Sequence, residues 1–248
     1  MASDPRRSPV PSAWIAGCEA AHARLHAIAD RISDDDARRD TLLEGWTVGH
    51  LLTHLARNAD SHRGMVEAAQ RGEVIAQYPG GPAQRNGDIE RGSARPGSDL
   101  AADLKAADQQ LEHAWSTTAQ RVWATGLGLR RYGPATMAEF VFLRWREVEI
   151  HLVDLNLPDL GSPDWHRLNP SYIDAELPEL SRNLATRVPE SATIVLAPGD
   201  RPSRAFGKGD DRIVIEASPG EIVAWLMGRG GLCPAGCEPS WPALRPWE

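Results

Sequence analysis

The strongest constraint on the fold is a helical repeat of apolar residues in four long segments between residues 12 and 155. Apolar side chains recur three and four residues apart in four long segments, which lie roughly at residues 12–32, 45–71, 98–118 and 134–155. Each such helix must bury one apolar face, and four in succession are typical of a four-helix bundle. We therefore expect an N-terminal four-helix bundle.

The starts of two of these helices carry capping signals. Ser12 follows two nearby prolines, which favour extended backbone, so we expect Ser12 to be the N-cap of the first helix. Thr47 is the expected N-cap of the second helix, because its hydroxyl can accept an unpaired backbone N–H of the first turn. His50 then falls at the third helical position, where a capping role is the simpler interpretation.

Residues 78–98, between the second and third helices, show no helical repeat. They run from Tyr78-Pro-Gly-Gly-Pro82 to Arg95-Pro-Gly-Ser98, with glycine and proline at both ends. Loops of this length inside a compact domain are usually functional or disordered. We therefore expect an irregular loop whose polar groups are candidates for closing over a ligand.

The pattern changes near residues 157–163, Leu-Pro-Asp-Leu-Gly-Ser-Pro, which we interpret as a domain boundary. We expect the bundle to cover residues 1–157 and a second domain to cover residues 165–248. The second domain is expected to contain a helix from residue 169 to 188 interrupted by Pro178, strands at 192–197 and 212–217, and a capped helix from 219 to 228. The fold class expected for the whole chain is therefore α plus α/β, a four-helix bundle followed by a small mixed domain.

Composition excludes several classes of protein. The chain contains no apolar run near the ~18 residues of a membrane span, and the polar start shows no secretory signal. A formal charge of −7 argues against a nucleic-acid partner. Three cysteines cannot form a disulfide framework, so we expect a cytoplasmic protein; two of them, Cys233 and Cys237, offer only a weak metal-site pattern.

Glu147 and His151 are the first candidates for chemistry. They lie four residues apart in the fourth helix and so project from one face, beside its most apolar stripe. Burying a carboxylate is costly unless it is paired or binds a metal. His54, on the inward side of the second helix, would complete a set of two histidines and one carboxylate, which is typical of catalytic zinc sites.

Other interpretations of these residues remain open at this point. A Glu/His pair four residues apart is common on helices, and a single buried histidine is more often a core residue. His50 and His54 are also four apart and could form a competing pair. His62 lies about 12 Å beyond His54 along the helix, too far to share its metal. The acidic runs at residues 34–36 and 210–211 are expected to be solvated.

Two helical segments together resemble a known family. Residues 44–60, Glu-Gly-Trp-Thr-Val-Gly-His-Leu-Leu-Thr-His-Leu-Ala-Arg-Asn-Ala-Asp, and residues 144–155, Arg-Trp-Arg-Glu-Val-Glu-Ile-His-Leu-Val-Asp-Leu, resemble signatures of mycothiol-dependent maleylpyruvate isomerases. The resemblance implies a DinB-like metal-binding bundle joined to a small α/β domain. It also implies that His54, Glu147 and His151 are ligands of zinc or another divalent metal, and that mycothiol is the thiol cosubstrate.

The same resemblance implies a reaction. A metal-bound thiolate would add to an electrophilic substrate and isomerise maleylpyruvate to fumarylpyruvate. Alternatives are a transferase that joins mycothiol to another electrophile, a non-catalytic metal- or ligand-binding protein and, less favoured, a hydrolase. We expect small-molecule partners, an anionic or electrophilic substrate with mycothiol, and a monomer or small homo-oligomer.

Arg229 is the candidate catalytic residue from the second domain. It matches the position of a family arginine that holds the substrate, and it lies among Gly228, Gly230 and Gly231, which leave room for a ligand. The alternative is that Arg229 only offsets the dipole of the preceding helix.

Overall fold

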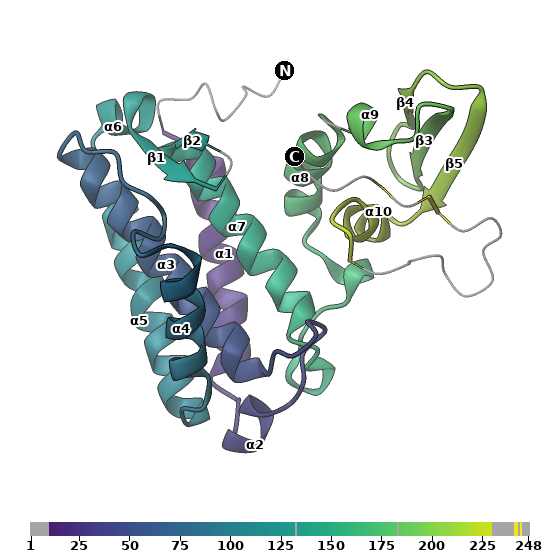
Figure 1. Ribbon diagram of the computed structural model, residues 1–248. Helices are drawn as coiled ribbons and strands as arrows, with labels where there is room; N and C mark the ends of the chain where they lie inside the picture. Colours follow the sequence, from purple (N-terminus) through teal and green to yellow (C-terminus); the bar gives the residue numbers. More distant parts are fainter. Residues whose placement is uncertain (1–9, 132, 183, 230–240, 243, 245–248) are drawn as a thin grey trace. The chain divides into compact units, whose positions relative to one another are not determined.

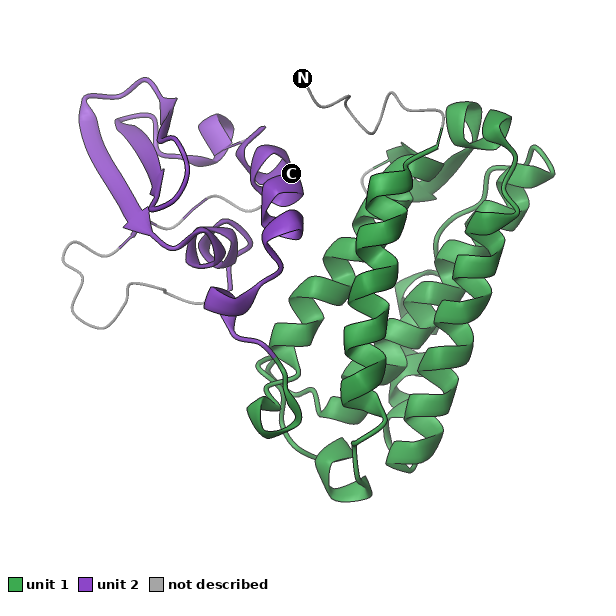
Figure 2. Ribbon diagram, turned by 180° about the vertical axis from the view of Figure 1, so that it is seen from behind, with its two compact units in different colours: residues 1–162 green, residues 163–248 purple. Residues whose placement is uncertain are grey.

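The computed structural model describes residues 10–131, 133–182, 184–229, 241, 242 and 244. The chain divides into two compact units, residues 1–162 and residues 163–248, which are coloured separately in Figure 2. Cys233 and Cys237 lie outside the described residues. Among the residues that are described, no helix combines the length and the apolarity needed to cross a membrane.

Four long helices form the core of the first unit. They are α1 (Ser12–Ala29), α3 (Val48–Gln70), α5 (Gly97–Ser116) and α7 (Met137–Asp154). Helix α1 packs against α5 and α7, and α3 packs against the same two helices, so the four close into a ring (Figure 1). Their apolar stripes meet in a core that includes Leu25, Leu55, Leu104 and Val148, all fully buried. The predicted α plus small α/β fold is confirmed.

The helix starts agree with one capping prediction and contradict the other. The backbone N–H of Thr47 donates to Nδ1 of His50 over 3.2 Å, so His50 does take part in capping α3. Ser12, however, is the first residue inside α1, and Pro11 occupies the N-cap without a side-chain hydrogen bond. The prediction for Ser12 was wrong because the carbonyl of Pro11 accepts the backbone N–H groups of Trp14 and Ile15, which makes Pro11 the residue that flanks the helix.

The expected loop at residues 78–98 is instead largely helix α4 (Gly81–Ser93). Pro82 fits the first turn of a helix, where no backbone N–H is needed. Of the α4 residues only Ile89 is buried, which is why the sequence shows no apolar repeat. The helix is held by packing on α3, where Gly49 lets the backbone of Ser93 approach closely.

Short elements that the sequence did not predict surround the bundle. They are α2 (Asp34–Ala37), α6 (Gln120–Thr125) and a hairpin of β1 (Leu127–Arg130) and β2 (Gly133–Thr136). Strand β2 occupies residues that we expected to begin the fourth helix. Helix α7 therefore starts at Met137, capped by Thr136, whose hydroxyl accepts a hydrogen bond from the N–H of Glu139.

The second unit is a small mixed domain, as expected. Its three-stranded sheet has the order β4-β3-β5, with β3 (Ala192–Pro198) parallel to β5 (Asp211–Ala217) and antiparallel to β4 (Arg204–Gly207). The predicted capped helix is α10 (Pro219–Leu226), which opens with a capping box of Ser218 and Glu221 and packs on both β3 and β5. Helices α8 (Pro170–Arg182) and α9 (Leu184–Arg187) complete the unit, and the short strand β4 was not predicted.

Candidate metal centre

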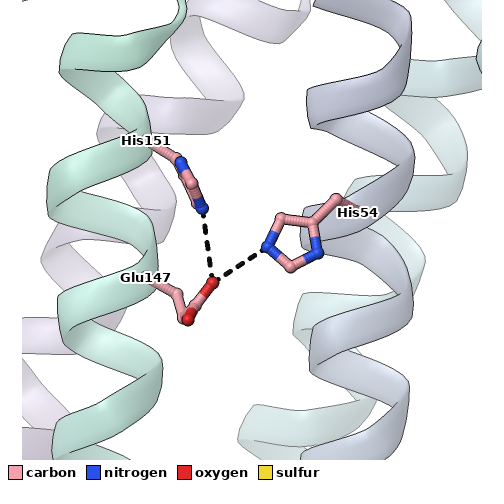
Figure 3. A group of neighbouring side chains, drawn as sticks. All are labelled: His54, Glu147 and His151. Atoms are coloured by element: carbon pink, nitrogen blue, oxygen red, sulfur yellow. Dashed lines mark hydrogen bonds and ion pairs between the residues drawn. The ribbon is translucent and has the colours of Figure 1, made fainter. Parts of the chain in front are cut away.

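Three side chains from two helices of the bundle converge on one point. His54 comes from α3, and Glu147 and His151 come from successive turns of α7 (Figure 3). One carboxylate oxygen of Glu147 lies 2.9 Å from Nε2 of His54 and 3.4 Å from Nε2 of His151. One ligand atom from each of the three lies within 4.8 Å of the other two.

The three residues differ in exposure. The side chains of His54 and His151 are 6% and 10% exposed, whereas that of Glu147 is 34% exposed. The imidazoles are therefore fixed within the bundle, and the side chain of Glu147 between them is only half-buried.

Asp154 fixes the orientation of His151. Its carboxylate lies 2.9 Å from Nδ1 of His151, so the Nδ1–H donates and Nε2 faces Glu147 and His54. Carboxylates behind metal-binding histidines hold the ring in this way. Burial acts to lower the pKa of His151, but the hydrogen bonds and negative charges of Asp154 and Glu147 outweigh it and raise the pKa above the usual value.

Burial has the opposite result at His54. It lowers the pKa of His54 to about 4, despite the hydrogen bond and negative charge of Glu147. His54 is therefore neutral at physiological pH. Burial acts to raise the pKa of Glu147, but the two histidines hold this pKa well below its usual range. An ionised carboxylate and a neutral imidazole are the forms in which these side chains bind metals.

The spacing of the three donors fits a zinc ion. Zinc binds histidine nitrogen and carboxylate oxygen at about 2.0–2.2 Å in tetrahedral sites, which places neighbouring ligand atoms about 3.3 Å apart. The two distances to Glu147, 2.9 Å and 3.4 Å, lie on either side of that value. Three protein ligands would leave a fourth position for a substrate or cosubstrate.

A buried polar network holds α7 against the other helices close to this centre. Arg144, which is fully buried, donates to the carbonyl of Leu55 over 2.9 Å and to the side chain of Asn58 over 2.8 Å. It also pairs with the buried Asp108 of α5 over 2.6 Å. Because Leu55 directly follows His54, Arg144 ties the helix of Glu147 to the helix of His54.

The remaining candidates lie elsewhere. His50 caps α3, and its Nε2 lies 3.3 Å from the carboxylate of Glu90. His62 is buried beside Phe140, with ring centroids 5.4 Å apart. Arg229 belongs to the second unit, where its backbone N–H donates to the carbonyl of Ala224 and closes the end of α10. The structure thus brings His54, Glu147 and His151 together and uses His50 and His62 differently.

A family model agrees with this arrangement. The model for the mycothiol maleylpyruvate isomerase N-terminal domain matches residues 18–156, which include all three converging residues. The chain belongs to this family. The match covers the bundle and ends before the second unit begins.

Two solved structures share the isomerase fold over nearly the whole chain. One is a crystal structure of mycothiol-dependent maleylpyruvate isomerase, at 24% identity and a TM-score of 0.80, which covers 94% of this chain and 95% of that chain. The other is a histidine-to-alanine mutant of such an isomerase, also at 24% identity, with a TM-score of 0.75 and coverage of 88% of both chains. No curated protein matches this sequence.

Two residues that contact the candidate metal ligands were not predicted from the sequence. Asp154 had a signal, since it lies three residues beyond His151 and so projects from the same side of α7. Arg85 had none, because the helix that carries it was not predicted. Its guanidinium donates to Nδ1 of His54 over 3.1 Å.

Proposed function

We propose that this protein is a zinc-dependent enzyme that uses mycothiol to isomerise maleylpyruvate to fumarylpyruvate. The observation that carries the proposal is the convergence of His54, Glu147 and His151 on one point inside the bundle. Membership of the isomerase family supplies the thiol and the reaction class. The two solved isomerases support the same fold in both units.

The proposed chemistry depends on activating a thiol. A free thiol has a pKa of about 8.5, and only its thiolate attacks well. When bound, zinc would supply a positive centre that favours the thiolate. The thiolate would add to the cis double bond, rotation would follow about the resulting single bond, and loss of the thiol would leave the trans isomer. His54, Glu147 and His151 would hold the ion, and Asp154 would keep His151 oriented.

We propose Arg229 as the residue of the second unit that binds a substrate carboxylate. The end of α10 fixes its backbone: Gly228 has a φ of +71°, and the N–H groups of Gly228 and Arg229 donate to the carbonyls of Trp225 and Ala224. This is the Schellman arrangement, in which glycine provides the left-handed residue. Arg229→Lys should then preserve the fold and zinc content but lose much of the turnover of an anionic substrate.

Metal analysis tests the ligand set. Purified wild type should contain about one zinc ion per chain, whereas His54→Ala and Glu147→Ala should contain far less. His50→Ala is the matched control, because His50 lies on the same helix and caps it instead. Equal metal content in the wild type and both ligand variants would contradict the assignment.

Incubation with maleylpyruvate tests the reaction. Zinc-loaded protein should form fumarylpyruvate when mycothiol is present and none when it is omitted. Consumption of the thiol without isomerisation would replace the proposal with a transferase. No conversion in either condition would contradict an isomerase and leave a binding role or another electrophile.

A further inference from the structure

Arg85 of α4 lies beside the candidate metal centre, in contacts that do not neutralise its charge. One amino group of its guanidinium donates to Nδ1 of His54 over 3.1 Å, and the other donates to the side-chain oxygen of Asn86 over 3.0 Å. The guanidinium carbon also lies 5.9 Å from the ring centroid of Trp46 and 5.7 Å from that of Tyr78. Two aromatic rings thus hold a cation next to His54.

Arg85 differs from its neighbouring arginines in having no acidic partner. Within the described part of the chain, no carboxylate oxygen lies within 4.0 Å of its guanidinium, whereas Arg57 and Arg95 both pair with Asp103, and Arg91 pairs with Asp88. A half-buried arginine without a carboxylate is a candidate for binding one from a ligand.

A cavity gives such a ligand access to Arg85. It has a volume of about 280 Å³, and its walls include Arg85, Tyr78, Arg57, Asp60 and Asp88. Both aspartates already have partners, since Asp60 pairs with Arg57 over 3.0 Å and Asp88 pairs with Arg91. This volume is just below the usual range for small-molecule sites, about 300–1,000 Å³, and suits a compact acid.

The hydrogen bond between Arg85 and His54 is incompatible with a metal on His54. A guanidinium can only donate, so Nδ1 of His54 must accept, and Nε2–H then donates to Glu147. A neutral histidine that binds a metal through Nε2 carries its proton on Nδ1 instead. Two donors would then face each other, and the guanidinium would have to leave Nδ1. The other ligand, His151, already donates from Nδ1 to Asp154 and needs no such change.

We propose that Arg85 is a substrate-binding residue of the bundle, which is released from His54 when the metal binds and then holds a carboxylate group of the substrate. The inference rests on the proposed function, whose substrate is a keto acid with two carboxylates. Trp46 and Tyr78 would hold the plane of the guanidinium, and its N–H groups would bind the carboxylate in parallel.

Binding of maleate, a small dicarboxylate without a thiol, tests the proposal without requiring turnover. Calorimetry on the zinc-loaded protein should show binding that weakens about tenfold to a hundredfold in Arg85→Gln, the usual range for a lost charge-assisted pair. Arg91→Gln is the matched control, since it removes the same charge from the same helix at a site paired with Asp88. Equal maleate affinity in the two variants would overturn the proposal.

Zinc affinity provides a second measurement, in which Arg85→Gln should cause no loss of binding, in contrast to its effect on maleate. If Arg85 must leave His54 before zinc binds, Arg85→Gln should bind zinc at least as tightly as the wild type. Zinc binding tenfold weaker in this variant would mean that Arg85 supports His54 in the metal-bound state, which would also overturn the proposal.

Failure of this inference can be distinguished from failure of the proposed function. If the wild type binds zinc and isomerises maleylpyruvate while Arg85→Gln and Arg91→Gln behave alike, only the role of Arg85 is wrong. If the wild type binds no zinc at His54, Glu147 and His151, the proposed function itself is wrong.

Discussion

Asp108→Asn should destabilise the bundle strongly, because it leaves a buried arginine without its counter-charge. Asp108 and Arg144 are both fully buried, with nitrogen and oxygen 2.6 Å apart. The other oxygen of Asp108 accepts a hydrogen bond from His26 over 2.8 Å. Burial acts to raise the pKa of Asp108, but Arg144 and His22 outweigh it and lower the pKa below the usual value. Asp108 is therefore ionised in the folded protein.

The magnitude follows from the burial of both partners. Removing one member of a buried ion pair typically costs about 3–5 kcal/mol, since the other charge remains out of water and unpaired. That cost is a large part of the 5–15 kcal/mol that usually stabilises a folded domain. Asp159→Asn is the control: Asp159 pairs with Arg39 at the surface, where its side chain is 56% exposed, and solvent screens such a pair so that its loss should change stability little.

Urea titration, with the helix content monitored by circular dichroism, measures the free energy of unfolding of both variants. In an Arg144→Met background, Asp108→Asn should cost much less, because no buried charge is then left unpaired. A loss below about 1 kcal/mol for Asp108→Asn in the wild type would refute the reasoning, because buried and exposed pairs would then behave alike.

Two further predictions concern stability. Burial lowers the pKa of His62 to about 3, whereas the pKa of a histidine in the unfolded chain is near 6.5. The buried, neutral His62 therefore makes its full contribution to the unfolding free energy above pH 6.5, and this contribution is lost as the pH falls toward 3. Between about pH 7.5 and pH 5, His62→Gln should therefore lose about 2 kcal/mol less unfolding free energy than the wild type; an equal loss would contradict the pKa shift. Gly49→Ala should cost about 1–3 kcal/mol in urea unfolding, because its Cβ would lie 2.1 Å from the carbonyl oxygen of Ser93. Gly64→Ala, where nothing lies within 4 Å, should instead be neutral or stabilising.

The bundle could be predicted from sequence because its helices each bury a continuous apolar stripe. Helix α4 could not, since its only buried residue is Ile89 and its stability comes from packing on α3. The short strand β4 was missed for a related reason. Its residues are exposed or half-buried, and its place in the sheet depends on pairing with β3. Elements that depend on contacts distant in sequence leave no local pattern to detect.

The candidate ligands could be predicted because helical geometry fixes which residues meet. Glu147 and His151 lie four apart, and His54 is one of the buried residues of α3. Arg85 reaches the same point from α4, and no spacing along the sequence relates it to His54. The sequence therefore indicated the three residues that converge but not the guanidinium of Arg85 beside them.

One face of α7 carries both a member of a buried ion pair and two of the candidate metal ligands. Arg144, Glu147 and His151 lie at positions i, i+3 and i+7, so all three project toward the interior from one side. Arg144 is fully buried, and its charge is matched by Asp108. The side chain of Glu147 is 34% exposed, and one of its carboxylate oxygens contacts the imidazoles of both His54 and His151. A buried ion pair such as that of Arg144 and Asp108 can often be replaced by apolar residues without loss of stability. The carboxylate of Glu147 cannot be replaced in this way if it holds a metal. Apolar replacement of Arg144 together with Asp108 should therefore preserve a folded bundle that still binds zinc, and only changes at Glu147 and its two histidines should abolish binding.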